Sequence, residues 1–215
     1  MKLRNQLLAV FATFLLSTAA FLGGCATTGM DRSVKTSNFI RDVDNEIRKM
    51  VVQIDVTAAS LDALVAPGQS DVKKAFKTYS NDLDNLESEG NRTLKRINEM
   101  REHSKEYFDE WEKQGLEYKN PEIRGLSEER RIKLAEIYGR VPAAGAGIKN
   151  AYIAYLTNLK EIKVYLSNDL TPQGLITIDP VAKKAVQDKE VLKSSLQPLL
   201  EAMDEIKAEL YSGKK

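Results

Sequence analysis

Apolar residues recur every seven positions over most of this chain, and that period admits few folds. The first stripe combines two interleaved sets, Ile40, Ile47, Ile54 and Leu61 with Val43, Met50, Thr57 and Leu64. Alternating steps of three and four residues place all of them on one face of a single helix. Because Pro67-Gly68 cannot continue a helix, this helix is predicted to end near Ala66.

Similar stripes predict further helices along the chain. Ser70 or Asp71 can cap the N-terminus of the second helix, which is predicted to end near Gly115. The residues from Gly90 to Thr93 in this helix are small, so they either let a neighbouring helix approach closely or leave a soft spot. The remaining helices are predicted over 126–166 and about 181–211.

Prolines raise two questions about these helices. Pro142 lies within the third stripe and marks either a kink or a break; the kink is favoured, because the stripe continues through it. The stretch 168–180 has two prolines and a glycine and is predicted to be a connection, packed on the bundle through Leu175, Ile176 and Ile178.

Helices of about 45–65 Å joined by short connections must run antiparallel to their neighbours. The sequence therefore predicts an all-α fold over residues 34–215, an elongated antiparallel helix bundle or coiled coil of three to four long helices. Trp111 shares the stripe of the second helix and is expected to be buried there.

The N-terminus has the pattern of an export signal. Lys2 and Arg4 precede an apolar run from Leu7 to Leu22, which is shorter than the ~20 residues of a comfortable membrane span. Leu22-Gly23-Gly24-Cys25 resembles the lipobox of bacterial lipoproteins. The resemblance implies that residues 1–24 are a lipoprotein signal peptide, that Cys25 is lipidated and that the new N-terminus is acylated. The alternative is an uncleaved membrane helix with an incidental cysteine.

Residues 25–33 follow as a predicted flexible lipid tether, since they are small and polar and show no period. In lipoproteins of Gram-negative bacteria an aspartate after the cysteine commonly means inner-membrane retention. Ala26 stands there instead, which favours the outer membrane and a periplasm-facing domain.

Charge and composition exclude several function classes. Removing Lys2 and Arg4 with the signal leaves 30 of the 32 basic residues against 31 acidic ones, so no basic excess favours nucleic acid or anionic lipid. His103 is the only histidine and Cys25 the only cysteine, which leaves no zinc set and no di-iron motif. No catalytic, metal or cofactor residue is predicted.

Acidic residues gather along the second helix at Glu102, Glu106, Asp109, Glu110 and Glu112. They could bind a divalent cation. Lys105 and Lys113 lie among them, however, so a solvated face with ion pairs along the helix is the favoured interpretation.

Phe108-Asp109-Glu110-Trp111, together with Tyr165-Leu166-Ser167-Asn168, resembles a family of helical bacterial lipoproteins catalogued as a domain of unknown function. That resemblance implies a helical, partly coiled-coil domain and no established activity. We therefore predict a non-enzymatic, lipid-anchored scaffold or interaction protein of the cell envelope, held to the membrane through Cys25, with envelope proteins or a second copy as partners. The alternatives are an accessory of an envelope transport system, or a ligand-binding or hydrolytic lipoprotein.

Overall fold

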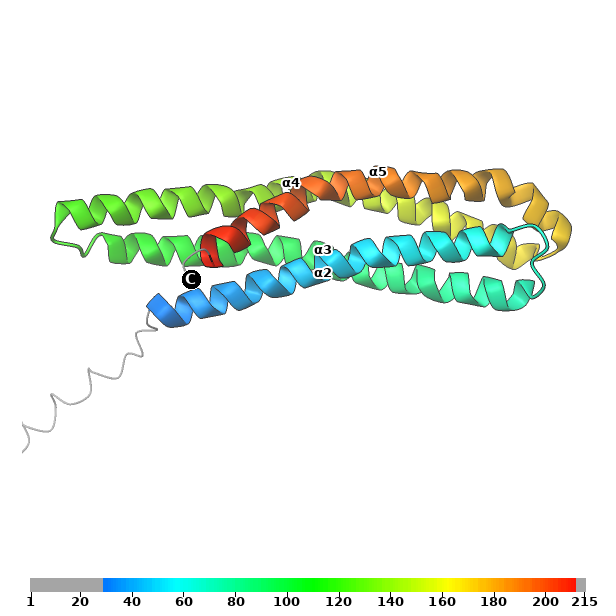
Figure 1. The fold of residues 1–215 in the computed structure, drawn as a ribbon, viewed down its shortest axis with the longest axis horizontal. Helices are drawn as coiled ribbons and strands as arrows, with labels where there is room; N and C mark the ends of the chain where they lie inside the picture. Colours follow the sequence, from blue (N-terminus) through cyan, green and yellow to red (C-terminus); the bar gives the residue numbers. More distant parts are fainter. Residues whose placement is uncertain (1–28, 212–215) are drawn as a thin grey trace, which may run out of the picture. The chain divides into compact units, whose positions relative to one another are not determined.

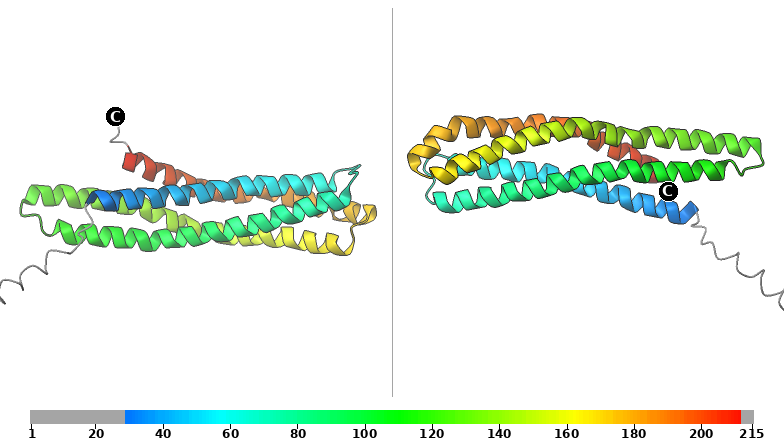
Figure 2. Two further views of the ribbon diagram at one scale, coloured as in Figure 1. Left: turned by 90° about the horizontal axis from the view of Figure 1, so that it is seen from below. Right: turned by 180° about the vertical axis from the view of Figure 1, so that it is seen from behind.

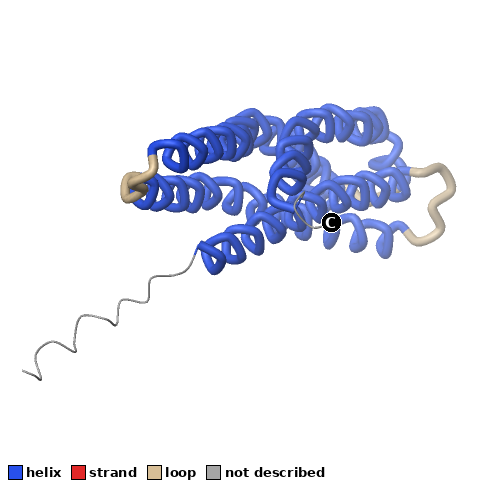
Figure 3. The backbone as a smooth tube through the Cα atoms, turned by 60° about the vertical axis from the view of Figure 1, so that its left-hand side comes forward, coloured by secondary structure: helices blue, strands red, loops and turns tan. Residues whose placement is uncertain are grey.

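The structure, a computed structural model, describes residues 29–211, and the chain divides into two units, 1–35 and 36–215. The helix bundle lies in the second unit. Its helices are α2 (Gly29–Val65), whose first residues belong to the other unit, α3 (Val72–Gly115), α4 (Pro121–Asn168) and α5 (Pro172–Tyr211) (Figures 1 and 3). The described residues contain no strand, and the predicted all-α bundle of three to four long helices is confirmed with four.

The four helices alternate in direction and lie in a ring, in which the first also contacts the last (Figure 2). Polar contacts join each neighbouring pair: Thr93–Glu46 for α3 and α2, Lys160–Glu87 for α4 and α3, Arg140–Glu205 for α4 and α5, and Lys193–Asp55 for α5 and α2. Each contact joins residues that are far apart in the sequence. Together, the four contacts show which helices are neighbours in the bundle.

The core lies along the predicted stripes. All eight positions of the α2 stripe from Ile40 to Leu64 are buried, as are the central positions of the other three helices. Thr57 and Thr93 are also buried, and their hydroxyls donate to backbone carbonyls at 2.8 and 3.1 Å. The Thr57 hydroxyl bonds within its own helix and the Thr93 hydroxyl bonds to α2, so both buried hydroxyls have a partner.

α4 and α5 begin earlier than predicted, because each has as its first residue a proline that opens the helix. α4 starts at Pro121 and not near Leu126, and the Asn120 side chain caps it by accepting from the Glu122 amide at 2.9 Å. Proline is well suited to the first helical position, where its missing N–H has no partner to lose.

The predicted connection over 168–180 is likewise wrong for most of its length. α5 begins at Pro172, and the Thr171 hydroxyl accepts from the Gly174 amide at 3.1 Å. Leu175 is buried and Ile178 packs on the core as predicted, whereas Ile176 is exposed. Pro180 and Pro198 both lie inside this helix.

α4 is continuous through Pro142, which confirms that the chain does not break there. Near the N-terminus, residues 29–33 belong to α2, so the predicted flexible tether does not extend to them. Asp31 lies in the first turn of α2, where an acidic side chain favours the start of a helix. The signal peptide and Cys25 lie outside the described residues.

Candidate functional site

The core stops before the ends of α3 and α4. Phe108 is the last buried residue of α3 and Leu134 the first of α4, and every residue between them whose exposure is described is exposed or half-buried. Residues 109–133, here called the hairpin tip, therefore form two helix ends and a turn without a core of their own. The tip contains three of the four residues of the Phe108-Asp109-Glu110-Trp111 motif.

Trp111 is half-buried, so the expectation that it is a buried core residue was wrong. Its indole nitrogen donates to the Ser127 hydroxyl at 2.9 Å and thereby joins the two helices of the tip. The ring stacks on Phe108 at a centroid distance of 6.5 Å. Beside it lies a cavity of about 80 Å³, bordered by Gly115, Arg124 and Arg131 among others, which is too small for a drug-sized ligand.

The charged residues near the tip are engaged with one another. Lys105 bonds Asp109, and Arg131 lies 3.6 Å from Glu112. The exposed His103 ring packs on Phe39 of α2 with centroids 4.3 Å apart. Within residues 29–211 no three histidine, cysteine or acidic side chains are placed to hold a metal ion.

Apolar side chains are concentrated at the tip. Five of the thirteen large hydrophobic residues that are exposed in residues 29–211 lie there: Leu116, Tyr118, Ile123, Leu126 and Ile132. Leu116 is 70% exposed and Leu126 62%. None of the described helices is long and apolar enough to cross a membrane.

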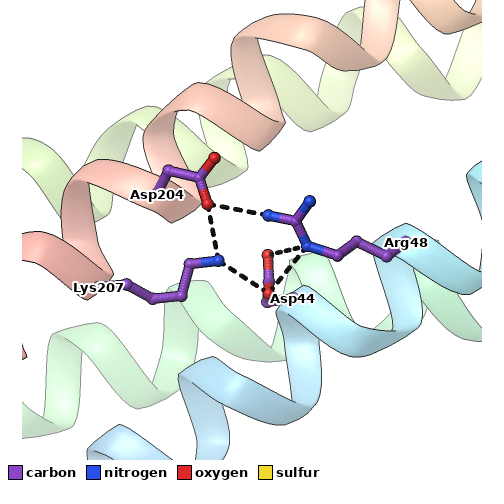
Figure 4. A network of polar contacts seen from close by, with 4 residues as sticks. All are labelled: Asp44, Arg48, Asp204 and Lys207. Atoms are coloured by element: carbon purple, nitrogen blue, oxygen red, sulfur yellow. Dashed lines mark hydrogen bonds and ion pairs between the residues drawn. The ribbon is translucent and has the colours of Figure 1, made fainter.

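A second polar cluster joins the first and last helices (Figure 4). The Asp44 carboxylate accepts from Arg48 Nε at 3.1 Å and from Lys207 Nζ at 2.9 Å. Asp204 accepts from both cations in turn, at 2.8 and 2.7 Å. Two acids and two bases thus close a ring across the α2–α5 contact.

The charges in this cluster stabilise one another. A hydrogen bond from Lys207 lowers the pKa of Asp204, and the bond to Asp44 raises the pKa of Arg48. Burial opposes the charge of Lys207, yet its bonds to Asp204 and Asp44 raise its pKa overall. The contacts in this cluster therefore favour the charged forms of Arg48, Asp204 and Lys207.

We expect Asp44→Ala to lower the free energy of unfolding by about 1–3 kcal/mol, because the half-buried Lys207 ammonium and the Arg48 guanidinium lose their most buried partner. Asp42→Ala removes a carboxylate from the same helix that is 58% exposed and should change stability by less than about 0.5 kcal/mol. Urea unfolding followed by circular dichroism measures both. Equal changes in the free energy of unfolding from the two substitutions would show that the cluster does not stabilise the fold.

Asp44 follows Val43 and lies off the apolar stripe of the first helix, yet it is only 6% exposed. The spacing of Asp44 and Arg48, one helical turn apart, is a signal for an ion pair. The same spacing recurs at many exposed pairs in this chain, so the signal cannot show which pair is buried. The register of α2 against α5 decides that.

Comparison with known proteins shows a family. A search of the curated proteins and a search of the solved structures each found no match. Residues 31–209, however, match the model of a protein family described as a protein of unknown function, DUF2959. The match spans all four helices, both the tip and the polar cluster. The chain therefore belongs to the DUF2959 family.

Proposed function

We propose that this protein is a lipoprotein of the bacterial cell envelope, acylated on Cys25, that serves as a non-enzymatic helical scaffold or interaction protein. One observation carries the proposal: Leu22-Gly23-Gly24-Cys25 stands at the end of a charged and then apolar export segment. The anchor is the acylated Cys25, since more than one acyl chain holds a protein stably on a bilayer. Ala26 favours the outer membrane, with the bundle facing the periplasm.

The scaffold role is supported by how the bundle uses its side chains. Apolar residues of all four helices fill the interior, and many charged residues pair with one another between helices. The unit is thus held together mainly by its own packing, and it presents long helical surfaces of mixed charge. Its partners are then other envelope proteins or a second copy of the chain.

The proposal is tested by metabolic labelling with a fatty-acid probe in a Gram-negative host that expresses the full chain. The wild-type protein should carry the label and fractionate with membranes. Cys25→Ser should lose both the label and cleavage before residue 25, because serine offers no thiol for acylation. Thr28→Ser, a conservative change three residues away, should behave as wild type. Undiminished labelling of Cys25→Ser would contradict acylation at this site.

A further inference from the structure

The exposed apolar residues of the hairpin tip are placed as a membrane contact would be. Leu116 and Tyr118 follow the end of α3, and Ile123 and Leu126 lie in the first turns of α4, so the four are clustered around one short turn. Aliphatic side chains next to a tyrosine are typical of segments that enter the interface of a bilayer. The charges at the turn are balanced, with Glu117 and Glu122 beside Lys119 and Arg124.

One turn at the opposite end of the bundle, between α2 and α3, lacks this character. The turn between α2 and α3 consists of 66–71, with the sequence Ala-Pro-Gly-Gln-Ser-Asp. Apart from the proline and the alanine it is polar or glycine, and it has no large exposed hydrophobic residue. The other turn at that end, between α4 and α5, has the exposed Val164 and Ile176 near it, so exposed apolar residues occur at both ends but are most numerous at the hairpin tip.

Residue 36, where the bundle unit begins, lies at the same end as the tip. Phe39 of α2 packs on His103 of α3, and from there α3 continues for twelve more residues to Gly115. Those residues carry the tip about 18 Å further along the direction of α3. The chain that leads back to Cys25 thus joins the bundle near the base of the tip and far from the 66–71 turn.

The chain before Phe39 is long enough for an anchor at the level of the tip. Cys25 precedes Phe39 by fourteen residues. That length reaches at most about 50 Å when extended and about 21 Å as one continuous helix. Both lengths exceed the ~18 Å by which the tip passes Phe39.

We propose that the hairpin tip binds the surface of the bilayer in which the acyl chains of Cys25 are inserted. This inference rests on the proposed acylation. Leu116 and Leu126 enter the interface, and the tip gives the bundle a second point of contact with the membrane besides the lipid.

The test uses the full acylated chain in vesicles of phosphatidylethanolamine and phosphatidylglycerol. Acylation of Cys25, checked by mass spectrometry, leaves an introduced cysteine as the only thiol. Gly125→Cys places a fluorophore at the tip, at a site where an added Cβ has no atom within 4 Å. Ser70→Cys places it at the exposed opposite turn. Quenchers attached to lipid should quench the label at residue 125 and leave the one at residue 70 unaffected.

A double substitution shows whether the leucines cause the effect. Leu116→Ser/Leu126→Ser in the Gly125→Cys background should reduce the quenching roughly tenfold or more, because the transfer free energy of two leucines is lost. Val164→Ser/Val191→Ser removes two other exposed apolar side chains, 60% and 68% exposed, and should leave quenching unchanged. All six are surface positions, so circular dichroism should report full helicity in every variant.

The failures of the two proposals can be told apart. A membrane-bound, acylated chain whose residue 125 label is not quenched overturns the tip contact and leaves the lipoprotein proposal standing; the tip then serves a protein partner. Protection of this label without vesicles, rising with protein concentration, overturns it in favour of a second copy. An unacylated Cys25 overturns both proposals.

Discussion

Raising the pH above about 10 should unfold the bundle. Tyr79, Tyr152 and Tyr155 are at most 3% exposed, and burial raises the pKa of each above its ordinary value of 10.0. In the unfolded chain these phenols lose their protons from about pH 10, while in the folded chain they keep them. The unfolded state therefore binds fewer protons there, and stability falls as the pH rises.

The expected effect is large because three groups act together. Each contributes up to about 1.4 kcal/mol per pH unit above its unfolded pKa, so three contribute as much as roughly 8 kcal/mol by about pH 12. That is comparable to the whole stability of a typical domain. Circular dichroism during an alkaline titration should show loss of helix together with the part of the tyrosinate absorbance that these three buried tyrosines contribute, and not after it.

Tyr155→Phe provides the matched variant. The Tyr155 hydroxyl is buried and has no hydrogen-bond partner among the described residues, so its removal should be neutral or stabilising at neutral pH. The variant should also lose about a third of the alkaline slope and unfold at higher pH. Tyr118→Phe, at an exposed site, should leave the slope as it is. If the two variants titrate alike, lysine deprotonation and not tyrosine burial drives alkaline unfolding.

Gly90→Ala should destabilise the bundle by about 2 kcal/mol or more, because a single added methyl group has no room. A Cβ at this position would overlap ring atoms of Tyr152 on α4. The ring cannot easily move, since it is buried and its hydroxyl lies 3.2 Å from the carbonyl oxygens of Leu86 and Glu87. Urea denaturation measures the loss.

Gly139→Ala is the control, because it makes the same chemical change inside a helix at an exposed position with nothing within 4 Å of the new Cβ. It should raise stability by up to about 1 kcal/mol through helix propensity. Tyr152→Leu should recover part of the loss in the Gly90→Ala background. A stabilising Gly90→Ala would show that α3 and α4 are not in close contact here.

The sequence predicted the burial pattern of this bundle well and its helix starts less well. The seven-residue period of apolar residues determines which face of α2 is buried, and Pro67-Gly68 marks where that helix ends. The buried face and the end of α2 could therefore be predicted. The small residues from Gly90 to Thr93 left two alternatives, a close approach or a soft spot, and the structure shows the close approach, made by Tyr152. The starts of α4 at Pro121 and of α5 at Pro172 were not predicted, because a proline can stand either after the end of one helix or at the first position of the next.

The contacts between helices could not be predicted from the sequence, for a different reason. The Asp44 cluster depends on α5 lying beside α2 at one particular register. No local pattern encodes that register, since it results from the packing of all four stripes at once. The projection of the hairpin tip beyond Phe108 and Leu134 likewise depends on how α3 and α4 pack in the bundle, which helix lengths predicted to within several residues cannot give.

Closure of the ring by α2 and α5 makes the stability of the bundle depend on α5 being present. Asp44 and Lys207 are 163 residues apart, and Leu199, Met203 and Ile206 complete the buried core only after the other three helices have been made. A chain truncated within α5 would keep the apolar stripes of the other three helices, but these would lack the helix that packs between α4 and α2. Such fragments should stay largely unfolded and be removed by proteases, so that only copies that contain α5 accumulate.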